Sequence, residues 1–261
     1  MQVRDKIIVV TGAGDGIGRA LADRFAAEGA ARIVVADIDG AKAQAVARRV
    51  GGESFGVDVA DAKAVGEMID RIEREVGAID LYCSNAGILR LDPVDGTCAD
   101  ASDGDWQASW SVNVMSHVYA ARALLPRMIR RGGGAFLITV SAAGLLSQIG
   151  SGPYSVTKHA ALAFAECLAI AHGHQGIEVA ALCPQAVATP MIAGHEDSVA
   201  SVDGVLTPED VAASVVEGLR AETFLILPHP QVRQYMERKA TDYERWLAGM
   251  RRLSERLRAG Q

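Results

Sequence analysis

The chain has 261 residues, of which 49% are hydrophobic, 22% are charged and 5% are aromatic. This composition excludes intrinsic disorder, collagen and coiled coil, and the length is common for one α/β domain with a large core. The formal net charge of −6 provides no electropositive surface for a phosphate backbone, so nucleic acid is not an expected partner.

The cysteines indicate a reducing compartment. They lie far apart and form no Cys-x-x-Cys pair, which favours free thiols over a disulfide framework or a zinc site. The four are Cys83, Cys98, Cys167 and Cys183. A second candidate for metal binding, His172 with His174, has no carboxylate or cysteine partner nearby in the sequence. No apolar stretch reaches the roughly 20 residues that span a bilayer. We therefore expect a cytoplasmic protein with no metal site and no membrane contact.

Short β-branched runs alternate with longer helical patterns along the chain. Seven runs are predicted strands, at residues 6–11, 32–37, 54–58, 78–85, 135–141, 177–183 and 223–228. The helical segments end near Gly29, Val50, Val76 and Arg131, and a further helix runs from Pro153 to His172. Continuous apolar strands between amphipathic helices are covered on both faces, which indicates a parallel sheet. We predict one doubly wound Rossmann domain over residues 1–261, with a seven-stranded parallel sheet and helices on both faces.

A glycine-rich turn, TGAGDGIGRA, directly follows the first predicted strand. Its glycines, at positions 12, 14, 16 and 18, let the backbone approach a pyrophosphate without a clash at Cβ. The N-terminus of the next helix offers free amides and a positive dipole to the same group. No Gly-Lys-Ser/Thr follows, so the turn is not a P-loop. The pattern predicts a dinucleotide site.

A carboxylate at the end of the second strand indicates which dinucleotide binds. Asp37 lies about twenty residues beyond the turn, where it accepts hydrogen bonds from the adenosine ribose hydroxyls. A 2′-phosphate would meet Asp37 and Asp15, with no basic partner except Arg19 or Arg32. The sequence therefore favours NAD over NADP.

Polar side chains also follow the next two strands. Asp58 ends the third strand, and Asn85, Ala86 and Gly87 end the fourth. Ligands of such sheets bind beyond the carboxyl ends of the strands, so we expect both groups in one crevice.

A candidate catalytic group begins where the fifth strand ends, at Ser141. Tyr154 and Lys158 follow in YSVTK, one helical turn apart, and so project from the same face of a helix. A neighbouring ammonium favours the phenolate of a tyrosine, which otherwise titrates near 10, and thus makes it a usable base. Ser141 is expected to hold the substrate oxygen beside that phenol.

From about Lys6 to Met191 these ordered motifs resemble the short-chain dehydrogenase/reductase family, in the branch with Thr-Gly-x-x-x-Gly-x-Gly. The matching elements are TGAGDGIG, Asp37, Asp58-Val59, Asn85-Ala86-Gly87, Asn113, Ser141, YSVTK and PQAVATPM from Pro184. The resemblance implies Tyr154 as general acid/base and Ser141 as the group that orients the substrate oxygen. It also implies that Lys158 lowers the tyrosine pKa and binds the nicotinamide ribose, and that Asn113 holds a water in the proton relay.

The resemblance further implies the cofactor contacts. These involve Gly12, Asp15, Gly16, Ile17, Gly18, Asp37, Ile38, Asp58, Val59, Asn85, Ala86, Gly87, Tyr154, Lys158, Pro184, Val187, Thr189 and Met191. It implies a homotetramer, or a homodimer, that uses the helices carrying Asn113 and Tyr154.

One position departs from the family pattern, because Gln185 follows Pro184 where the family has glycine. If the position requires a positive φ, Gln185 is strained. Alternatively, its amide reaches substrate or cofactor.

Three segments bear on the substrate. Residues 89–103 and 185–206 lack regular periodicity, and the second is expected to be a substrate loop or lid, with a mobile surface connection as the alternative. The tail at about 231–257 has helical spacing and is expected to pack on its own domain or on a sister subunit, although its arginines leave a membrane-surface role open. The apolar positions of this tail are Tyr235, Tyr243, Trp246, Leu247, Met250, Leu253 and Leu257.

The expected pocket is mostly apolar, with Ala142, Leu145, Ile149 and Gln185. Arg90 is either a partner for a substrate carboxylate or a surface side chain. The sequence thus predicts an NAD-dependent dehydrogenase of a hydrophobic secondary alcohol or ketone. The alternative is an NAD(H)-binding regulatory or scaffold protein of the same fold without turnover. Substrate identity, direction and pathway do not follow from the sequence.

Overall fold

The computed structural model describes residues 1–93, 96–194 and 199–259. Residues 195–198 of the expected substrate loop therefore lie outside the described residues, as do residues 94–95 of the first irregular stretch.

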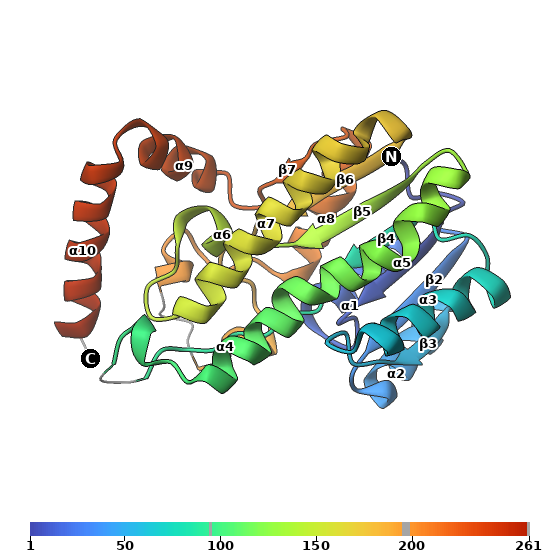
Figure 1. Ribbon diagram of the computed structural model, residues 1–261, viewed down its shortest axis with the longest axis horizontal. Helices are drawn as coiled ribbons and strands as arrows, with labels where there is room; N and C mark the ends of the chain where they lie inside the picture. Colours follow the sequence, from blue (N-terminus) through green and yellow to red (C-terminus); the bar gives the residue numbers. More distant parts are fainter. Residues whose placement is uncertain (94–95, 195–198, 260–261) are drawn as a thin grey trace.

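The centre of the molecule is one parallel sheet, as the sequence predicts (Figure 1). Its strands are β1 (Ile7–Thr11), β2 (Arg32–Asp37), β3 (Glu53–Gly56), β4 (Leu81–Ser84), β5 (Gly134–Thr139), β6 (Ile177–Leu182) and β7 (Leu225–Ile226). They lie in the order β3-β2-β1-β4-β5-β6-β7. The order reverses between β1 and β4, and such a switch point opens a crevice for a ligand beyond the carboxyl ends.

Helices cover both faces of the sheet. The α-helices of the described chain are α1 (Gly16–Ala27), α2 (Gly40–Val50), α3 (Ala62–Glu75), α4 (Asp103–Trp110), α5 (Ser116–Arg130), α6 (Ala143–Leu146), α7 (Gly152–His172), α8 (Pro208–Arg220), α9 (Gln231–Thr241) and α10 (Tyr243–Ala259), and the last two stand apart from the sheet. In β1 the side chain of Val9 faces the core beneath α3, α5 and α7, whereas Ile8 and Val10 face the core beneath α1, α2 and α8. This alternation explains the continuous apolar strands in the sequence.

The long helix expected before Arg131 is interrupted. α4 and α5 are joined by a π-helical turn, Ser111–Met115. One extra residue in such a turn changes the direction of a side chain, and π turns are frequent at functional sites.

The tail forms two helices instead of one, with the break at Asp242. α9 lies over α6, and α10 stands at the end of the molecule farthest from β3 and α2 (Figure 1). Together α9 and α10 form an arm beside the carboxyl ends of the strands.

Candidate active site

One cleft of about 2330 Å³ collects the predicted site residues. The residues given above as catalytic or as cofactor contacts of the family all line this cleft, with the exception of Asn113, and of the glycines in the turn only Gly14 does not line it. The lining comes from the ends of the six strands β1 to β6, from α7 and from the arm, so segments distant in sequence meet there.

The glycine-rich turn is too tight for side chains. Gly12 and Gly16 have φ of 61° and 51°. A Cβ on Gly12 would lie 2.8 Å from the Ala86 Cα, and one on Gly18 would overlap the Gly12 carbonyl oxygen. The backbone is therefore open toward the cleft, which fits the close approach of a pyrophosphate at the N-terminus of α1.

Asp37 joins the end of β2 to this turn. Its Oδ2 accepts a hydrogen bond from the Gly14 amide at 2.8 Å, and its Oδ1 accepts one from the Asp39 amide at 2.9 Å. Arg19 and Arg32 pair instead with Glu209 and Glu53. The basic residue that lines the cleft at this turn is Lys42, which the sequence reasoning missed; a Cβ on Gly14 would lie 2.8 Å from the Lys42 Cβ and 2.9 Å from the Asp37 Oδ2.

Lys42 lies in the first turns of α2, and its Nζ is 3.4 Å from the Asp15 carboxylate. The signal that could have identified it is its position five residues after Asp37, on the helix that starts at this edge of the sheet. Asp15 also caps α1 by accepting a hydrogen bond from the Gly16 amide at 2.7 Å.

Asn85 connects three strand ends. Its Nδ2 donates to the Thr11 carbonyl at 3.0 Å, and its Oδ1 accepts from the Thr139 hydroxyl at 3.0 Å. The Thr11 hydroxyl accepts from the amides of Asn85 and Ala86 at 3.0 and 3.2 Å. This network holds β1, β4 and β5 together at the switch point.

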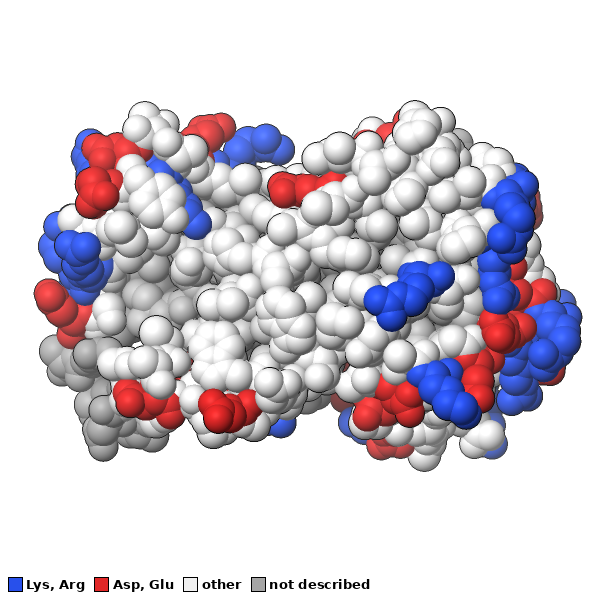
Figure 2. Space-filling view, in the orientation of Figure 1, with Lys and Arg blue, Asp and Glu red and all other residues white. Residues whose placement is uncertain are grey.

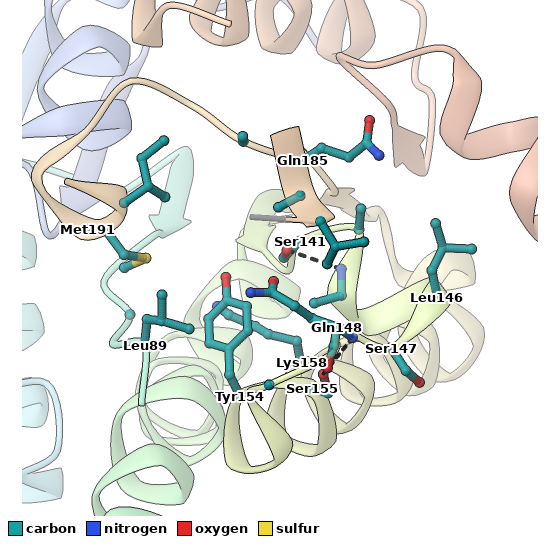
Figure 3. Close-up of a pocket in the computed structure, with 18 of the residues that line it drawn as sticks. Leu89, Ser141, Leu146, Ser147, Gln148, Tyr154, Ser155, Lys158, Gln185 and Met191 are labelled. Atoms are coloured by element: carbon teal, nitrogen blue, oxygen red, sulfur yellow. Dashed lines mark hydrogen bonds between the residues drawn. The ribbon is translucent and has the colours of Figure 1, made fainter. Parts of the chain in front are cut away.

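Ser141 follows β5 with a strained backbone. Its φ of 133° lies in a region that favours glycine. Its Oγ accepts a hydrogen bond from the Ala143 amide at 3.1 Å and lies 3.4 Å from the Pro184 carbonyl. The strain and these contacts direct the hydroxyl to the cleft, where Figure 3 shows it above the Tyr154 hydroxyl.

Tyr154 and Lys158 share one face of α7, as the spacing predicts. Burial raises the pKa of Tyr154, and a hydrogen bond with the Ser141 side chain opposes the rise. The Lys158 Nζ lies 5.6 Å from the centre of the tyrosine ring and donates to the Thr139 carbonyl at 2.9 Å. Burial lowers the pKa of Lys158 to about 8.

Asn113 lies in the π-helical turn and is fully buried. Its Oδ1 accepts from the Ile88 amide, and its Nδ2 donates to the Ile88 carbonyl, both at 2.9 Å. Nδ2 also lies 3.2 Å from the Thr157 hydroxyl. The side chain thus pairs with both backbone groups of Ile88, directly after Gly87, and behind the cleft wall.

His117 is a buried residue that the sequence reasoning missed. It lies one turn after Asn113, and its Nδ1 is 2.6 Å from the Ser84 hydroxyl. Burial, with the nearby Lys158, lowers the pKa of His117 to about 3, so its ring is neutral. Only the four-residue spacing from Asn113 could have indicated it.

Gln185 is not at a positive φ, so the strain considered for this position is absent. Its amide N–H donates to His229 Nδ1 at 3.1 Å. In the view of Figure 3 its side-chain amide points away from the Tyr154 hydroxyl. His229, which is 2% exposed, is thus the partner that the backbone at this position uses.

The walls of the cleft differ in detail from the expected pocket. Leu146 lines the cleft, whereas Leu145 packs into the core at 8% exposure. Arg90 forms an ion pair with Asp105 at 3.3 Å. His172 contacts Gln175 at 2.7 Å, and the described residues contain no cluster of ligands for a metal ion. Within the same residues, no helix is long and apolar enough to cross a membrane.

Comparisons with known proteins agree with this geometry. The model of the short chain dehydrogenase family matches residues 6–199. A 1-deoxy-11-beta-hydroxypentalenate dehydrogenase of Streptomyces exfoliatus is 35% identical over 240 residues, 89% of this chain and 86% of the relative. A meso-2,3-butanediol dehydrogenase of Serratia marcescens is 31% identical, over 82% of this chain and 86% of the relative. The crystal structure of a short-chain dehydrogenase/reductase from Burkholderia phymatum, in complex with NAD, superposes with a TM-score of 0.84 at 27% identity, over 94% of this chain and 96% of that one.

Proposed function

The chain belongs to the short-chain dehydrogenase family, and on this premise we propose that it is an NAD-dependent oxidoreductase that moves a hydride between nicotinamide and a secondary alcohol or ketone. The observation that carries the proposal is the meeting of the Ser141, Tyr154 and Lys158 side chains in the cleft that begins at the glycine-rich turn. The relatives named above are dehydrogenases of different compounds, so the reaction class is shared while the substrate is not.

In the proposed mechanism Tyr154 is the general acid/base. Its phenolate oxygen accepts the proton of an alcohol during oxidation, and its hydroxyl donates that proton to the carbonyl oxygen during reduction. Ser141 holds the substrate oxygen by a hydrogen bond as charge develops. Bound NAD supplies or accepts the hydride.

Lys158 and Asn113 support this chemistry from the second turn of α7 and from the π-helical turn. Lys158, in a dry environment, presents its ammonium below the tyrosine ring, and a cation there favours the phenolate. Asn113 fixes the backbone at Ile88 and thereby the chain segment that faces the nicotinamide end of the cleft.

The substrate is proposed to be hydrophobic. Ala142, Leu146, Ile149 and Met191 line the cleft near Tyr154 and carry no charge. A pocket with apolar walls and few polar groups binds an apolar body and orients one oxygen.

The test is a screen of secondary alcohols for NADH fluorescence, repeated with Tyr154→Phe. The variant keeps NADH binding and loses roughly 10²–10⁴-fold in turnover, as expected for removal of a general acid/base. Tyr119→Phe, on α5 and outside the cleft, is the matched control and retains turnover. Turnover that survives Tyr154→Phe on the same substrate refutes the catalytic assignment and leaves another mechanism, whereas NADH binding by the wild type without turnover of any substrate leaves the binding-protein alternative.

Two further parts of the proposal concern the whole molecule. We propose a homotetramer built through α5 and α7, because the face that these helices present carries few charged side chains (Figure 2). Cys83, Cys98, Cys167 and Cys183 are all free, which supports a cytoplasmic location.

A further inference from the structure

The arm of α9 and α10 forms one side of the active-site cleft. From α10, the residues Trp246, Gly249, Met250, Leu253 and Leu257 line the cleft together with Ser141 and Tyr154. Their spacing of three and four residues places them on one helix face. The apolar face of this helix is therefore turned toward the space in front of the catalytic group.

The arm is anchored at its base. The Lys239 Nζ donates to the Leu145 carbonyl at 2.7 Å and lies 4.9 Å from the centre of the Trp246 ring. The Tyr235 hydroxyl donates to Asp203 at 3.0 Å, and Val232 is fully buried in the core. These contacts tie α9 to α6 and to the loop after β6, so α10 has a defined position beside the cleft.

The cleft is larger than a dinucleotide site alone requires. Pockets for one drug-sized ligand measure about 300–1,000 Å³, against the 2330 Å³ observed. The residues assigned to the dinucleotide, among them Gly12 and Thr189, line one side of the cleft, and the arm lines the other side. The space left between Tyr154 and α10 suits an elongated ligand.

A row of arginines borders the apolar face. Arg245, Arg252 and Arg256 line the cleft and, at intervals of seven and four residues, follow one side of α10. Elsewhere Arg90 and Arg131 pair with carboxylates. In the described part of the chain, no ion pair engages the three arginines of α10.

Carboxylates are fewer on this wall. Glu237 and Asp242 also line it, and the Asp242 Oδ1 accepts a hydrogen bond from the Arg245 amide at 2.9 Å. Arg238 lies 5.7 Å from the centre of the Tyr235 ring. The wall therefore carries a net positive charge beside an apolar strip.

We propose that the arm is the outer wall of the substrate site and selects an elongated, apolar alcohol or ketone with an anionic group at the end remote from the reacting carbon. Trp246, Met250 and Leu253 contact the apolar body, and Arg252 and Arg256 bind the anion. The inference rests on the proposed function for the nature of the reacting group.

The test uses two matched fluorescent probes in saturating NAD⁺. 1-Anilinonaphthalene-8-sulfonate and N-phenyl-1-naphthylamine have the same rings, and only the first carries an anion. Arg252→Glu is expected to lower the affinity for the sulfonate probe roughly tenfold, because a charge-assisted contact is lost, while the affinity for the neutral probe changes less than twofold. Arg251→Glu, on α10 but outside the cleft, is the matched control and changes neither probe. Trp246→Ala is expected to lower the affinity for both probes.

Displacement extends the test to natural head groups. At least one of dodecanoate and dodecyl phosphate is expected to displace the sulfonate probe from the wild type. If neither compound displaces the probe, the inference is overturned. Equal effects of Arg251→Glu and Arg252→Glu, or equal affinity of the wild type for both probes, also overturn it. If the face of α10 instead binds a second copy, the wild type binds neither probe and Trp246→Glu lowers the sedimentation coefficient, which overturns it too.

Probe binding needs no turnover, so the two proposals fail separately. Tyr154→Phe is expected to bind the sulfonate probe as the wild type does. If this variant retains turnover, the proposed function fails while the probe results still decide the inference. If turnover depends on Tyr154 but Arg252→Glu leaves probe affinity unchanged, only the inference fails.

Discussion

The Asp37 carboxylate accepts a hydrogen bond from the Gly14 amide at 2.8 Å, which ties the end of β2 to the glycine-rich turn. One oxygen of this carboxylate thus sets the shape of the phosphate-binding turn. The same group carries the negative charge that is proposed to oppose a 2′-phosphate.

Asp37→Ala is expected to relax cofactor discrimination. The ratio of kcat/KM for NAD to that for NADP should fall by about tenfold or more, because the repulsion is removed and Lys42 can pair with the phosphate. Activity with NAD also falls, since the turn loses a hydrogen bond. The double variant with Lys42→Ala should lose most of the gain with NADP. A wild-type preference for NADPH in a titration contradicts this assignment.

Gly18→Ala is expected to abolish NADH binding. The new Cβ overlaps the Gly12 carbonyl oxygen and lies 2.7 Å from the Asn85 Nδ2, so the turn has to open. Gly66→Ala is the matched control, because a Cβ at this position in α3 meets nothing within 4 Å. The control should gain about 0.5–1 kcal/mol in the free energy of unfolding. Titration of NADH by fluorescence and urea unfolding decide the outcome.

His117 should make the fold sensitive to acid. Its pKa is lowered to about 3 in the fold, so below the ordinary value of 6.5 the unfolded chain binds a proton that the folded chain does not. The stability present above pH 6.5 is therefore lost as the pH falls toward 3. Between pH 7 and pH 5 the wild type should lose about 2 kcal/mol more than His117→Gln. Urea unfolding measures both, and exposed His174→Gln should follow the wild type.

Gln185→Gly tests the backbone at the position where the family has glycine. Because Gln185 is not at a positive φ, glycine relieves no strain and costs about 0.4–1 kcal/mol through the entropy of the unfolded chain. Glu222→Gly is the opposite case, since Glu222 follows α8 with a φ of 55°, and it should gain about 1 kcal/mol. An increase in the melting temperature of Gln185→Gly shows that the interpretation is wrong.

Ile170→Glu is expected to lower the number of subunits in the oligomer. Ile170 is 83% exposed on α7 and Val156 on the same helix is 49% exposed, which suits a subunit contact. Sedimentation should show a tetramer for the wild type and a smaller species for the variant. Val202→Glu, at 69% exposure on the loop after β6, is the control and should leave the tetramer intact. A wild-type monomer at working concentrations contradicts the proposed interface.

The strands, the glycine-rich turn and the shared helix face could be predicted from the sequence because each has a local cause. Continuous apolar runs mark strands covered on both faces, and the glycines at 12, 16 and 18 mark a turn without space for Cβ atoms. The spacing of Tyr154 and Lys158 on one helix turn likewise places them together. The seven-stranded parallel sheet and the expectation of one shared cleft follow from these signals.

Features that depend on contacts between residues far apart in the sequence could not be predicted. The pairing of Gln185 with His229 joins residues 44 positions apart, and the hydrogen bond between Asn113 and Ile88 joins residues 25 positions apart. The π-helical turn and the break at Asp242 have no distinct local pattern. Lys42 was missed because its relation to Asp37 depends on how α2 leaves the sheet.

The φ of 133° at Ser141 places backbone strain on a residue that is proposed to act in catalysis. Glycine would adopt this backbone at no steric cost but would remove the hydroxyl that is proposed to hold the substrate oxygen, whereas serine keeps the hydroxyl and accepts a conformational penalty of the order of 1–3 kcal/mol. Laboratory selection of this protein for heat resistance alone would therefore favour glycine at position 141 and, on the proposed mechanism, yield a more stable but inactive protein.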